Sequence, residues 1–278
     1  MEMNVLKVFV NEWLPPVIAR WVRQHRGKGV YFEGDFASWE QASSQCSGYD
    51  AKEILAKVLD STIKVKCGEA AFERDSVLFD QIEYVWPVLS GLMWAAASNG
   101  GRLNVLDFGG ALGSSYFQNR MFLKSIPELR WNVIEQEHYV KAGQAHIQDE
   151  QLRFYKTIED CLSENQISVV LLSSVLQYLP DPYELLKQIY NIQAKTIILD
   201  RTCYLNHGEI EIIKIQHVPS SIYTADYPCR FFIEDKLCDV FNTNGYQTIA
   251  AFDSLDKLSS IASWKGHIFQ LTKKKYDN

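Results

Sequence analysis

The sequence predicts an α/β protein with a mostly parallel sheet of seven strands, closed by an antiparallel final pair and preceded by a helical cap. Two observations support this fold class. From residue 102 onward, short apolar runs alternate with amphipathic segments, which is typical of parallel strands connected by helices. Before that point, apolar residues recur mainly at helical spacing. We therefore expect an N-terminal helical cap over residues 1–100 and a sheet-bearing core over residues 101–278.

The periodicity within the cap predicts helices separated by a loop. The first predicted helix is amphipathic, and arginines flank its apolar stripe. A basic helix of this kind can lie on a membrane surface, but we favour docking on the protein's own domain. Pro87 should bend or break the last helix. The helices are expected over residues 1–28, 50–66 and 72–97, and the loop between 27 and 48.

The core repeats a strand-and-helix pattern up to the antiparallel pair. A helix should follow the first strand, over residues 114–124. The stretch 201–230 follows the fifth strand, is rich in polar and aromatic residues, and is expected to form a substrate lid. Strands are expected at 103–107, 130–135, 152–155, 168–173, 196–200, 246–252 and 267–273, with further helices over 137–147, 182–193 and 233–244.

Composition and charge restrict the classes of function. The 278 residues are 47% hydrophobic and 22% charged, which suits one large domain or a domain with a cap. A formal net charge of -6 argues against a general nucleic-acid-binding protein, which would normally carry a basic face. No apolar run approaches the roughly 20 residues that span a bilayer. We expect no nucleic-acid partner and no stable membrane insertion.

The six cysteines indicate neither a metal site nor a disulfide framework. None forms a C-x-x-C pair, and no Cys/His group has zinc-finger spacing. No signal peptide follows Met1. These observations predict a cytoplasmic protein with reduced thiols and no bound metal.

The turn after the first strand has the composition of a ligand-binding loop. Glycines at 109, 110 and 113 follow Asp107, and they remove Cβ atoms from the approach path of a ligand. In an open parallel sheet, ligands bind outside the carboxyl ends of the strands. Glu135 ends the second strand, 22 residues after Gly113, where an acid can accept hydrogen bonds from a ribose. A solvated carboxylate is the alternative, and we favour the ribose role.

Several segments resemble one known family. The pattern Asp107-x-Gly-x-Ala-x-Gly113 resembles motif I of the class I S-adenosylmethionine (SAM) methyltransferases, with Ala111 in place of the middle glycine. The run from Ser173 to Pro182 is similar to the segment after their fourth strand, where Gln177 replaces a frequent histidine. From about residue 48 to the end, the chain resembles a family of bacterial methyltransferases of unassigned substrate, through these motifs and the segments 73–76, 131–136, 200–202 and 222–228.

The resemblance implies a Rossmann-like class I methyltransferase sheet, SAM as the cofactor, and methyl transfer to a small-molecule or glycan-type acceptor. It demands no metal. The implied cofactor-binding residues are Asp107, Gly109, Gly110, Gly113, Glu135, Gln136, Tyr155, Ser173 and Ser174. The implied substrate-binding residues are Gln177, Tyr178, Arg201, Tyr223 and Tyr227.

The identity of a general base is left open by the sequence. His207 and His217 are the candidates because histidine can take a proton near neutral pH, although each can equally be an ordinary loop residue. The charge triplet Glu73-Arg74-Asp75 is either a solvated helix face or a group that closes over the cleft. In the second case it would contact the amino-acid end of the cofactor or the substrate.

Two other functions fit parts of the sequence. A SAM- or nucleotide-binding protein without catalysis is compatible with the missing histidine after the fourth strand. A nicotinamide-dependent oxidoreductase would need a G-x-G-x-x-G fingerprint, and the register of the glycines disfavours it.

Overall fold

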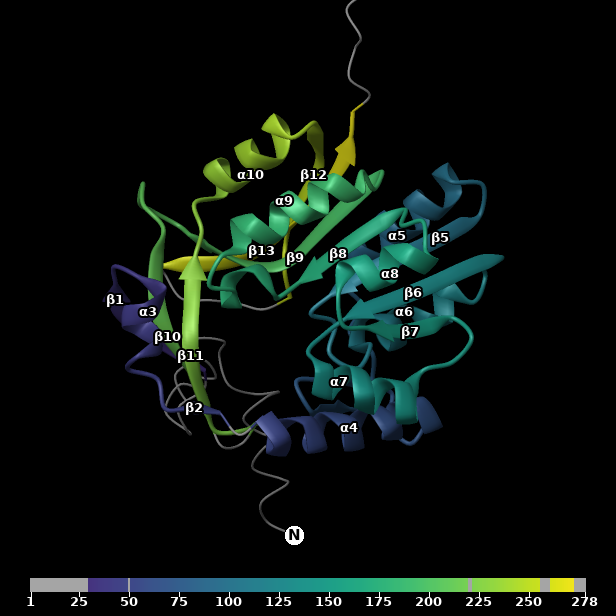
Figure 1. Cartoon of the computed structure of the whole chain (residues 1–278), viewed down its shortest axis with the longest axis horizontal. Helices are drawn as coiled ribbons and strands as arrows, with labels where there is room; N and C mark the ends of the chain where they lie inside the picture. Colours follow the sequence, from purple (N-terminus) through teal and green to yellow (C-terminus); the bar gives the residue numbers. More distant parts are fainter. Residues whose placement is uncertain (1–29, 50, 220–221, 256–260, 273–278) are drawn as a thin grey trace, which may run out of the picture.

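A seven-stranded sheet forms the centre of the computed structural model, which describes residues 30–49, 51–219, 222–255 and 261–272. The predicted helix over 1–28, with its alternative of membrane contact, lies outside the described residues. Neighbouring strands follow the order β12-β13-β9-β8-β5-β6-β7 (Figure 1). The strands are β5 (Arg102–Phe108), β6 (Glu128–Ile134), β7 (Leu152–Tyr155), β8 (Val169–Ser173), β9 (Thr196–Leu205), β12 (Tyr246–Asp253) and β13 (Ala262–Leu271).

The pairing within this sheet confirms the predicted fold class. The strands β7, β6, β5, β8 and β9 pair in parallel in that order. The strand β13 runs antiparallel to both β9 and β12. The sheet is therefore mostly parallel, with an antiparallel pair at one edge.

Helices cover both faces of the sheet. Successive side chains of each strand point to opposite faces, so each strand contributes to two apolar clusters. In β8, Val169 and Leu171 join one apolar cluster, and Val170 and Leu172 join the other. All four are fully buried, as a strand covered on both faces requires. The first cluster is covered by α4 (Ala51–Cys67), α5 (Trp86–Ser98), α6 (Ser114–Leu123) and α7 (Glu137–Ala142), and the second by α8 (Ile158–Glu164), α9 (Pro182–Ile192) and α10 (Glu234–Thr243).

Local sequence signals explain where two of these helices begin. The helix α9 starts at Pro182, and the carboxylate of Asp181 accepts from the backbone N–H of Glu184 at 3.0 Å. The helix α8, which the sequence analysis missed, begins after Thr157, whose hydroxyl accepts from the backbone N–H of Asp160. Its seven residues are too few for a clear apolar periodicity.

A second sheet of four strands stands beside the carboxyl ends of the first. Its order is β1-β10-β11-β2, and the arrowheads of β6 and β8 point toward it in Figure 1. It joins β1 (Tyr31–Phe36) and β2 (Gly48–Tyr49) with β10 (Ile212–Val218) and β11 (Ala225–Phe231), and the short helix α3 (Trp39–Ser43) packs on it. The predicted loop at 27–48 and the stretch at 201–230 thus contain strands that sequence reasoning missed.

The predicted helix over 72–97 is wrong in its first half. Residues 72–79 form a hairpin of β3 (Phe72–Arg74) and β4 (Val77–Phe79), and α5 begins only at Trp86. Asp75 and Ser76 form the turn and have φ angles of 52° and 67°. Pro87 lies in the first turn of α5, where its missing N–H costs nothing, so it helps to start the helix and does not bend it.

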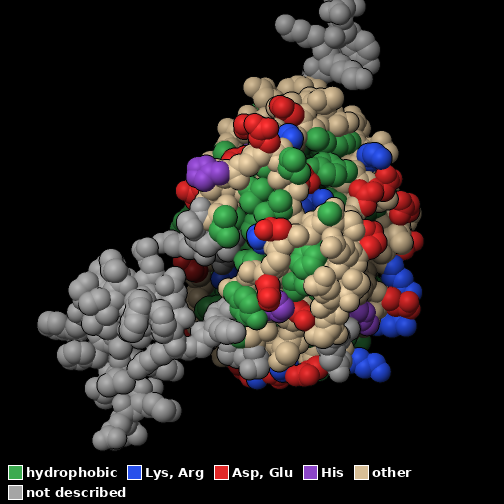
Figure 2. Space-filling view, turned by 90° about the vertical axis from the view of Figure 1, so that its left-hand side faces the viewer, with side chains coloured by type: hydrophobic (Ala, Val, Ile, Leu, Met, Phe, Trp, Pro, Cys, Tyr) green, Lys and Arg blue, Asp and Glu red, His purple; other side chains and the backbone are tan. Residues whose placement is uncertain are grey.

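The face that carries β1 and α3 mixes side chains of every kind. Figure 2 shows hydrophobic, acidic and basic side chains interspersed on the described part of this face. Within the described ranges, no helix has both the length and the apolar character that crossing a membrane requires.

Candidate functional site

A cavity of about 640 Å³ lies at the carboxyl ends of β5, β6, β8 and β9. Its floor includes the glycine turn after β5, and its other walls come from the β3–β4 hairpin, from β10 and β11, and from Ile222 and Tyr223 between them. This is the place where an open parallel sheet binds ligands. A volume of this size suits a drug-sized molecule or cofactor.

The glycine turn approaches its surroundings more closely than side chains would allow. The backbone N–H of Gly109 donates to the carbonyl of Ile134 at 2.9 Å, which joins the end of β5 to the end of β6. A Cβ on Gly110 would lie 2.5 Å from the carboxylate of Asp107. Ala111 has a φ of 50°, which explains why a glycine is the usual residue at this position of the resembled motif.

Asp107 lies beneath this turn and is only 1% exposed. Its Oδ2 accepts from the indole N–H of Trp131 at 3.0 Å, whereas its Oδ1 has no hydrogen-bond partner. Burial raises the pKa of Asp107 to about 7, and the bond from Trp131 opposes that rise. The carboxyl group is therefore a buried acceptor with capacity for one further donor.

Glu135 lies at the tip of β6 and lines the same cavity as the glycine turn. Its Oε2 accepts from the backbone N–H of Gln136, which also lines the cavity, at 2.7 Å. Burial raises the pKa of Glu135, and the backbone N–H groups of Gln136 and Ala111 act in the opposite direction. The carboxylate is thus held against the glycine turn at the end of the second strand.

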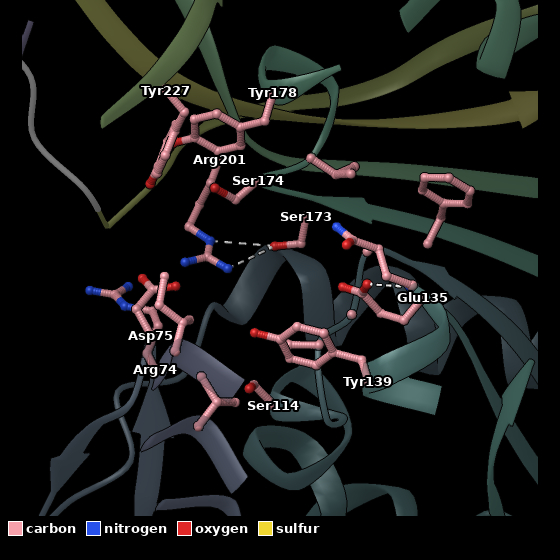
Figure 3. Close-up of a pocket in the computed structure, with 18 of the residues that line it drawn as sticks. Arg74, Asp75, Ser114, Glu135, Tyr139, Ser173, Ser174, Tyr178, Arg201 and Tyr227 are labelled. Atoms are coloured by element: carbon pink, nitrogen blue, oxygen red, sulfur yellow. Dashed lines mark hydrogen bonds between the residues drawn. The ribbon is translucent and has the colours of Figure 1, made fainter. Parts of the chain in front are cut away.

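Arg201 and Ser173 form a polar group at the ends of β8 and β9. The hydroxyl of Ser173 donates to Oδ2 of Asp200 at 2.8 Å and accepts from the guanidinium of Arg201 at 3.4 Å (Figure 3). Ser174 and Arg201 have φ angles of 56° and 49°, in the left-handed region. Residues other than glycine rarely adopt this backbone conformation. Such strained residues are concentrated at ligand sites. The backbone N–H of Arg201 donates to the hydroxyl of Ser254 at 3.1 Å.

Gln177 supports this group from behind and does not line the cavity. It is fully buried, and its amide N–H donates to the carbonyl of Arg201 at 3.0 Å and to the hydroxyl of Ser174 at 3.2 Å. It stands where the resembled family often has a histidine. Here the side chain of Gln177 holds Ser174 and Arg201 in place. The predicted direct contact of Gln177 with the substrate is therefore not seen, since Gln177 lies behind the cavity wall.

A chain of hydrogen bonds connects the helical turn after β8, Leu176–Tyr178, with the second sheet beside the cavity. The hydroxyl of Tyr178 donates to Oε1 of Gln216 at 2.9 Å, and Nε2 of Gln216 donates to the hydroxyl of Tyr227 at 3.1 Å. The rings of Tyr178 and Tyr227 meet edge to face at 5.2 Å. Together with Tyr223, these side chains line the cavity on the side of the second sheet.

The β3–β4 hairpin brings to the cavity the charge triplet for which the sequence left two alternatives, a solvated face or a contact across the cleft. Glu73, Arg74 and Asp75 all line the cavity, and Ser114 at the start of α6 donates to Oε1 of Glu73. Tyr139 of α7 also projects into the cavity, between Glu135 and Ser114 (Figure 3). The charge triplet was the sequence signal for the hairpin, and no signal singled out Tyr139.

Besides Gln177, four predicted site residues do not line this cavity. Gly113 precedes α6 with a φ of 91° and packs on Leu152. Tyr155 lines a different surface hollow, and its hydroxyl donates to Glu164 at 3.0 Å. The predicted bases also lie elsewhere: His207 is exposed, and His217 stacks on Tyr31 at 4.6 Å and faces Glu33 at 3.3 Å.

The remaining predicted residues are brought together by the fold. The cavity is lined by Asp107, Gly109, Gly110, Glu135, Gln136, Ser173, Ser174, Tyr178, Arg201, Tyr223 and Tyr227. Among the described residues, no group of three or more histidine, cysteine or acidic side chains is arranged to hold a metal ion. The donors and acceptors present suit an organic ligand with hydroxyl and charged groups.

Comparison with known proteins gave matches in structure alone. No protein-family model and no curated protein matches the chain. It is similar to the 1,6-didemethyltoxoflavin-N1-methyltransferase of Burkholderia thailandensis, solved with 1,6-didemethyltoxoflavin and S-adenosylhomocysteine (SAH), at 15% identity and a TM-score of 0.40, covering 82% of this chain and 95% of that one.

Two further solved structures have a similar architecture. One is the magnesium protoporphyrin IX methyltransferase of Synechocystis PCC 6803 with bound SAM, at 12% identity and a TM-score of 0.42, covering 97% and 96% of the two chains. The other is a SAM-dependent methyltransferase of Clostridium acetobutylicum, at 8% identity and a TM-score of 0.46, covering 81% and 100%. Similarities of this size assign neither an activity nor a substrate to this chain.

Proposed function

We propose that this protein is a methyltransferase that binds SAM in the cavity and methylates a small-molecule or glycan-type acceptor. One observation carries the proposal: the glycine turn after β5 and the carboxylate of Glu135 line one cavity, as the sequence motifs require of a nucleoside site. The motif resemblance supplies the identity of the cofactor.

The residues present fit SAM. Gly109 and Gly110 line the cavity and carry no side chain that would cover the backbone of the turn. Glu135 can accept hydrogen bonds from the two ribose hydroxyls, and the buried Oδ1 of Asp107 has capacity for one donor. When bound, SAM supplies an electrophilic methyl group on a sulfonium. Residues at the ends of β5 and β6 would hold its nucleoside, and Ser173 and Ser174 would lie beside the rest of the cofactor.

The acceptor is proposed to occupy the part of the cavity below the second sheet. There Tyr178, Gln216 and Tyr227 offer a hydrogen-bonded aromatic wall, and Arg201 presents a guanidinium held by Ser173. Holding the acceptor in line with the methyl group supplies most of the rate gain, since proximity and orientation contribute about 7–11 kcal/mol. A carboxylate acceptor needs no base. We place no step on His207 or His217, because neither lines the cavity.

We also propose that residues 1–100 and the stretch from about 201 to 230 act as one cover over a core of residues 101–278. The support is the second sheet, which pairs β1 and β2 with β10 and β11. The acceptor would then be enclosed by both segments.

Isothermal titration of the protein with SAH tests the cofactor site. We expect the Asp107→Ala and Glu135→Ala variants to bind SAH at least about tenfold more weakly, because each removes a charged hydrogen-bond partner. The Gly100→Ala variant, changed far from the cavity, should bind as the wild type does. Tight binding of NAD with none of SAH would indicate an oxidoreductase. Wild-type affinity for SAH in both acidic variants would refute the site.

Transfer of a labelled methyl group from SAM tests catalysis. The wild type should methylate at least one member of a panel of hydroxylated and carboxylated small molecules and sugars, and the Tyr178→Phe variant should do so more slowly. SAH binding without transfer to any acceptor would favour a cofactor-binding protein without catalysis.

A further inference from the structure

Glu73 is a buried acid at the cavity, and the sequence left open whether its charge triplet contacts the cofactor, contacts the substrate or faces solvent. It lies in β3, is 1% exposed and lines the cavity. Ser114 donates a hydrogen bond to its Oε1, while its Oε2 is buried and has no hydrogen-bond partner. A buried carboxylate oxygen left without a donor is costly, so the site favours a ligand that brings one.

The hairpin and Glu135 occupy opposite ends of the cavity. Figure 3 shows Arg74 and Asp75 at one end and Glu135 at the other, with Ser114 and Ser173 between them. A nucleoside whose ribose lies at Glu135 therefore directs its 5′ substituent across the glycine turn, toward the hairpin. In SAM that substituent ends in an amino acid, which carries an α-ammonium group.

Asp107 is less suited than Glu73 to meet that ammonium group. It lies beneath the turn, where a Cβ on Gly110 would be only 2.5 Å from its carboxylate, and its Oδ2 is already bonded to Trp131. Glu73 approaches from the hairpin, on the side of Ser114. A carboxylate that receives an ammonium donor in a buried place forms a charge-assisted hydrogen bond, which is stronger than a neutral one.

We propose that Glu73 binds the α-ammonium group of SAM and makes the protein selective for cofactors that carry it. This inference rests on the proposed function. It assigns a role to the β3–β4 hairpin: the hairpin recognises the amino-acid end of the cofactor, while Glu135 recognises its ribose.

The test compares SAH with its deaminated analogue, in which hydrogen replaces the α-ammonium group, by isothermal titration. The wild type should bind SAH at least about tenfold more tightly than the analogue. In Glu73→Gln this preference should fall to about twofold or less, with affinity for the analogue nearly unchanged. Glu73→Leu, which removes the buried acid entirely, should behave in the same way and serves if the glutamine variant folds poorly.

Asp80→Asn is the control, because it removes an exposed acid that directly follows the hairpin and does not line the cavity. It should keep the wild-type preference for SAH. Glu135→Ala should weaken both ligands by the same factor. An unchanged preference in Glu73→Gln and Glu73→Leu, or an equal loss of both ligands, would overturn the inference alone. Failure of the wild type to bind either ligand would instead overturn the proposed function and this inference with it.

Discussion

Gly110→Ala is the perturbation whose effect the structure defines most closely. The added Cβ would lie 2.5 Å from Cγ and Oδ2 of Asp107, about 1 Å inside the ordinary contact distance of 3.4 Å. Asp107 cannot retreat easily, because it is 1% exposed and its Oδ2 is bonded to Trp131 at 3.0 Å. Overpacking of this kind costs about 1–3 kcal/mol. Loss of the bond from Trp131 would add about 1–2 kcal/mol.

We therefore expect the free energy of unfolding to fall by about 2–5 kcal/mol, measured by urea denaturation, and SAH binding to be lost. The control is Gly100→Ala, because its Cβ would meet no atom within 4 Å. Because Gly100 has a φ of 67°, alanine there should lower the free energy of unfolding by about 1 kcal/mol. SAH binding should remain.

A double mutant tests whether the carboxylate is the cause. In the Asp107→Ala background the colliding carboxylate is absent. Gly110→Ala should therefore lower the free energy of unfolding there by less than about 1 kcal/mol. The reasoning is refuted if Gly110→Ala is as stable as the wild type within about 0.5 kcal/mol, or if the two changes are additive.

Three further predictions concern stability. Burial raises the pKa of Glu73 from 4.5 to about 7, so the folded state holds this proton more tightly and its contribution to stability is lost as the pH rises through about 7. The advantage in unfolding free energy of wild type over Glu73→Gln should therefore shrink by on the order of 1–2 kcal/mol between about pH 5 and about pH 8, and a constant or growing advantage contradicts this. Tyr178→Phe leaves Oε1 of Gln216 without its donor and should cost about 1–2 kcal/mol in urea denaturation, whereas an unchanged midpoint would argue against the bridge. Ser76→Gly should raise the free energy of unfolding by about 0.5–1 kcal/mol, because Ser76 and Asp75 both have positive φ in the turn; Ser76→Ala should give no gain, and equal gains would mean that backbone strain is not the cause.

The sheet could be predicted because its strands are buried on both faces and therefore read as continuous apolar runs. Residues 168–173 are such a run, and β8 occupies Val169–Ser173. The ends of these strands also indicated the site, since Asp107 and Glu135 line one cavity. Local pattern and the geometry of parallel sheets are sufficient for this part of the molecule.

The second sheet could not be predicted because its strands lack a clear period and pair over long distances. In β1 the residues Glu33 and Asp35 interrupt the apolar pattern, and the partner strand follows only at Ile212–Val218. The sequence predicts a helix at 72–79, where the structure has a hairpin, because apolar residues such as Val77 and Leu78 continue into the helical pattern of α5. The candidate bases His207 and His217 were named from residue type, and only the fold shows that neither lines the cavity.

The pairing of β1 with β10 has a consequence for synthesis on the ribosome. Tyr31 pairs with His217, 186 positions later in the chain. At about 5–20 residues per second, the earlier strand emerges roughly 10–40 s before its partner. During that interval its edge is open to other chains, and the charges of Glu33 and Asp35 discourage such pairing. Neutral residues at these two positions should therefore increase aggregation during translation.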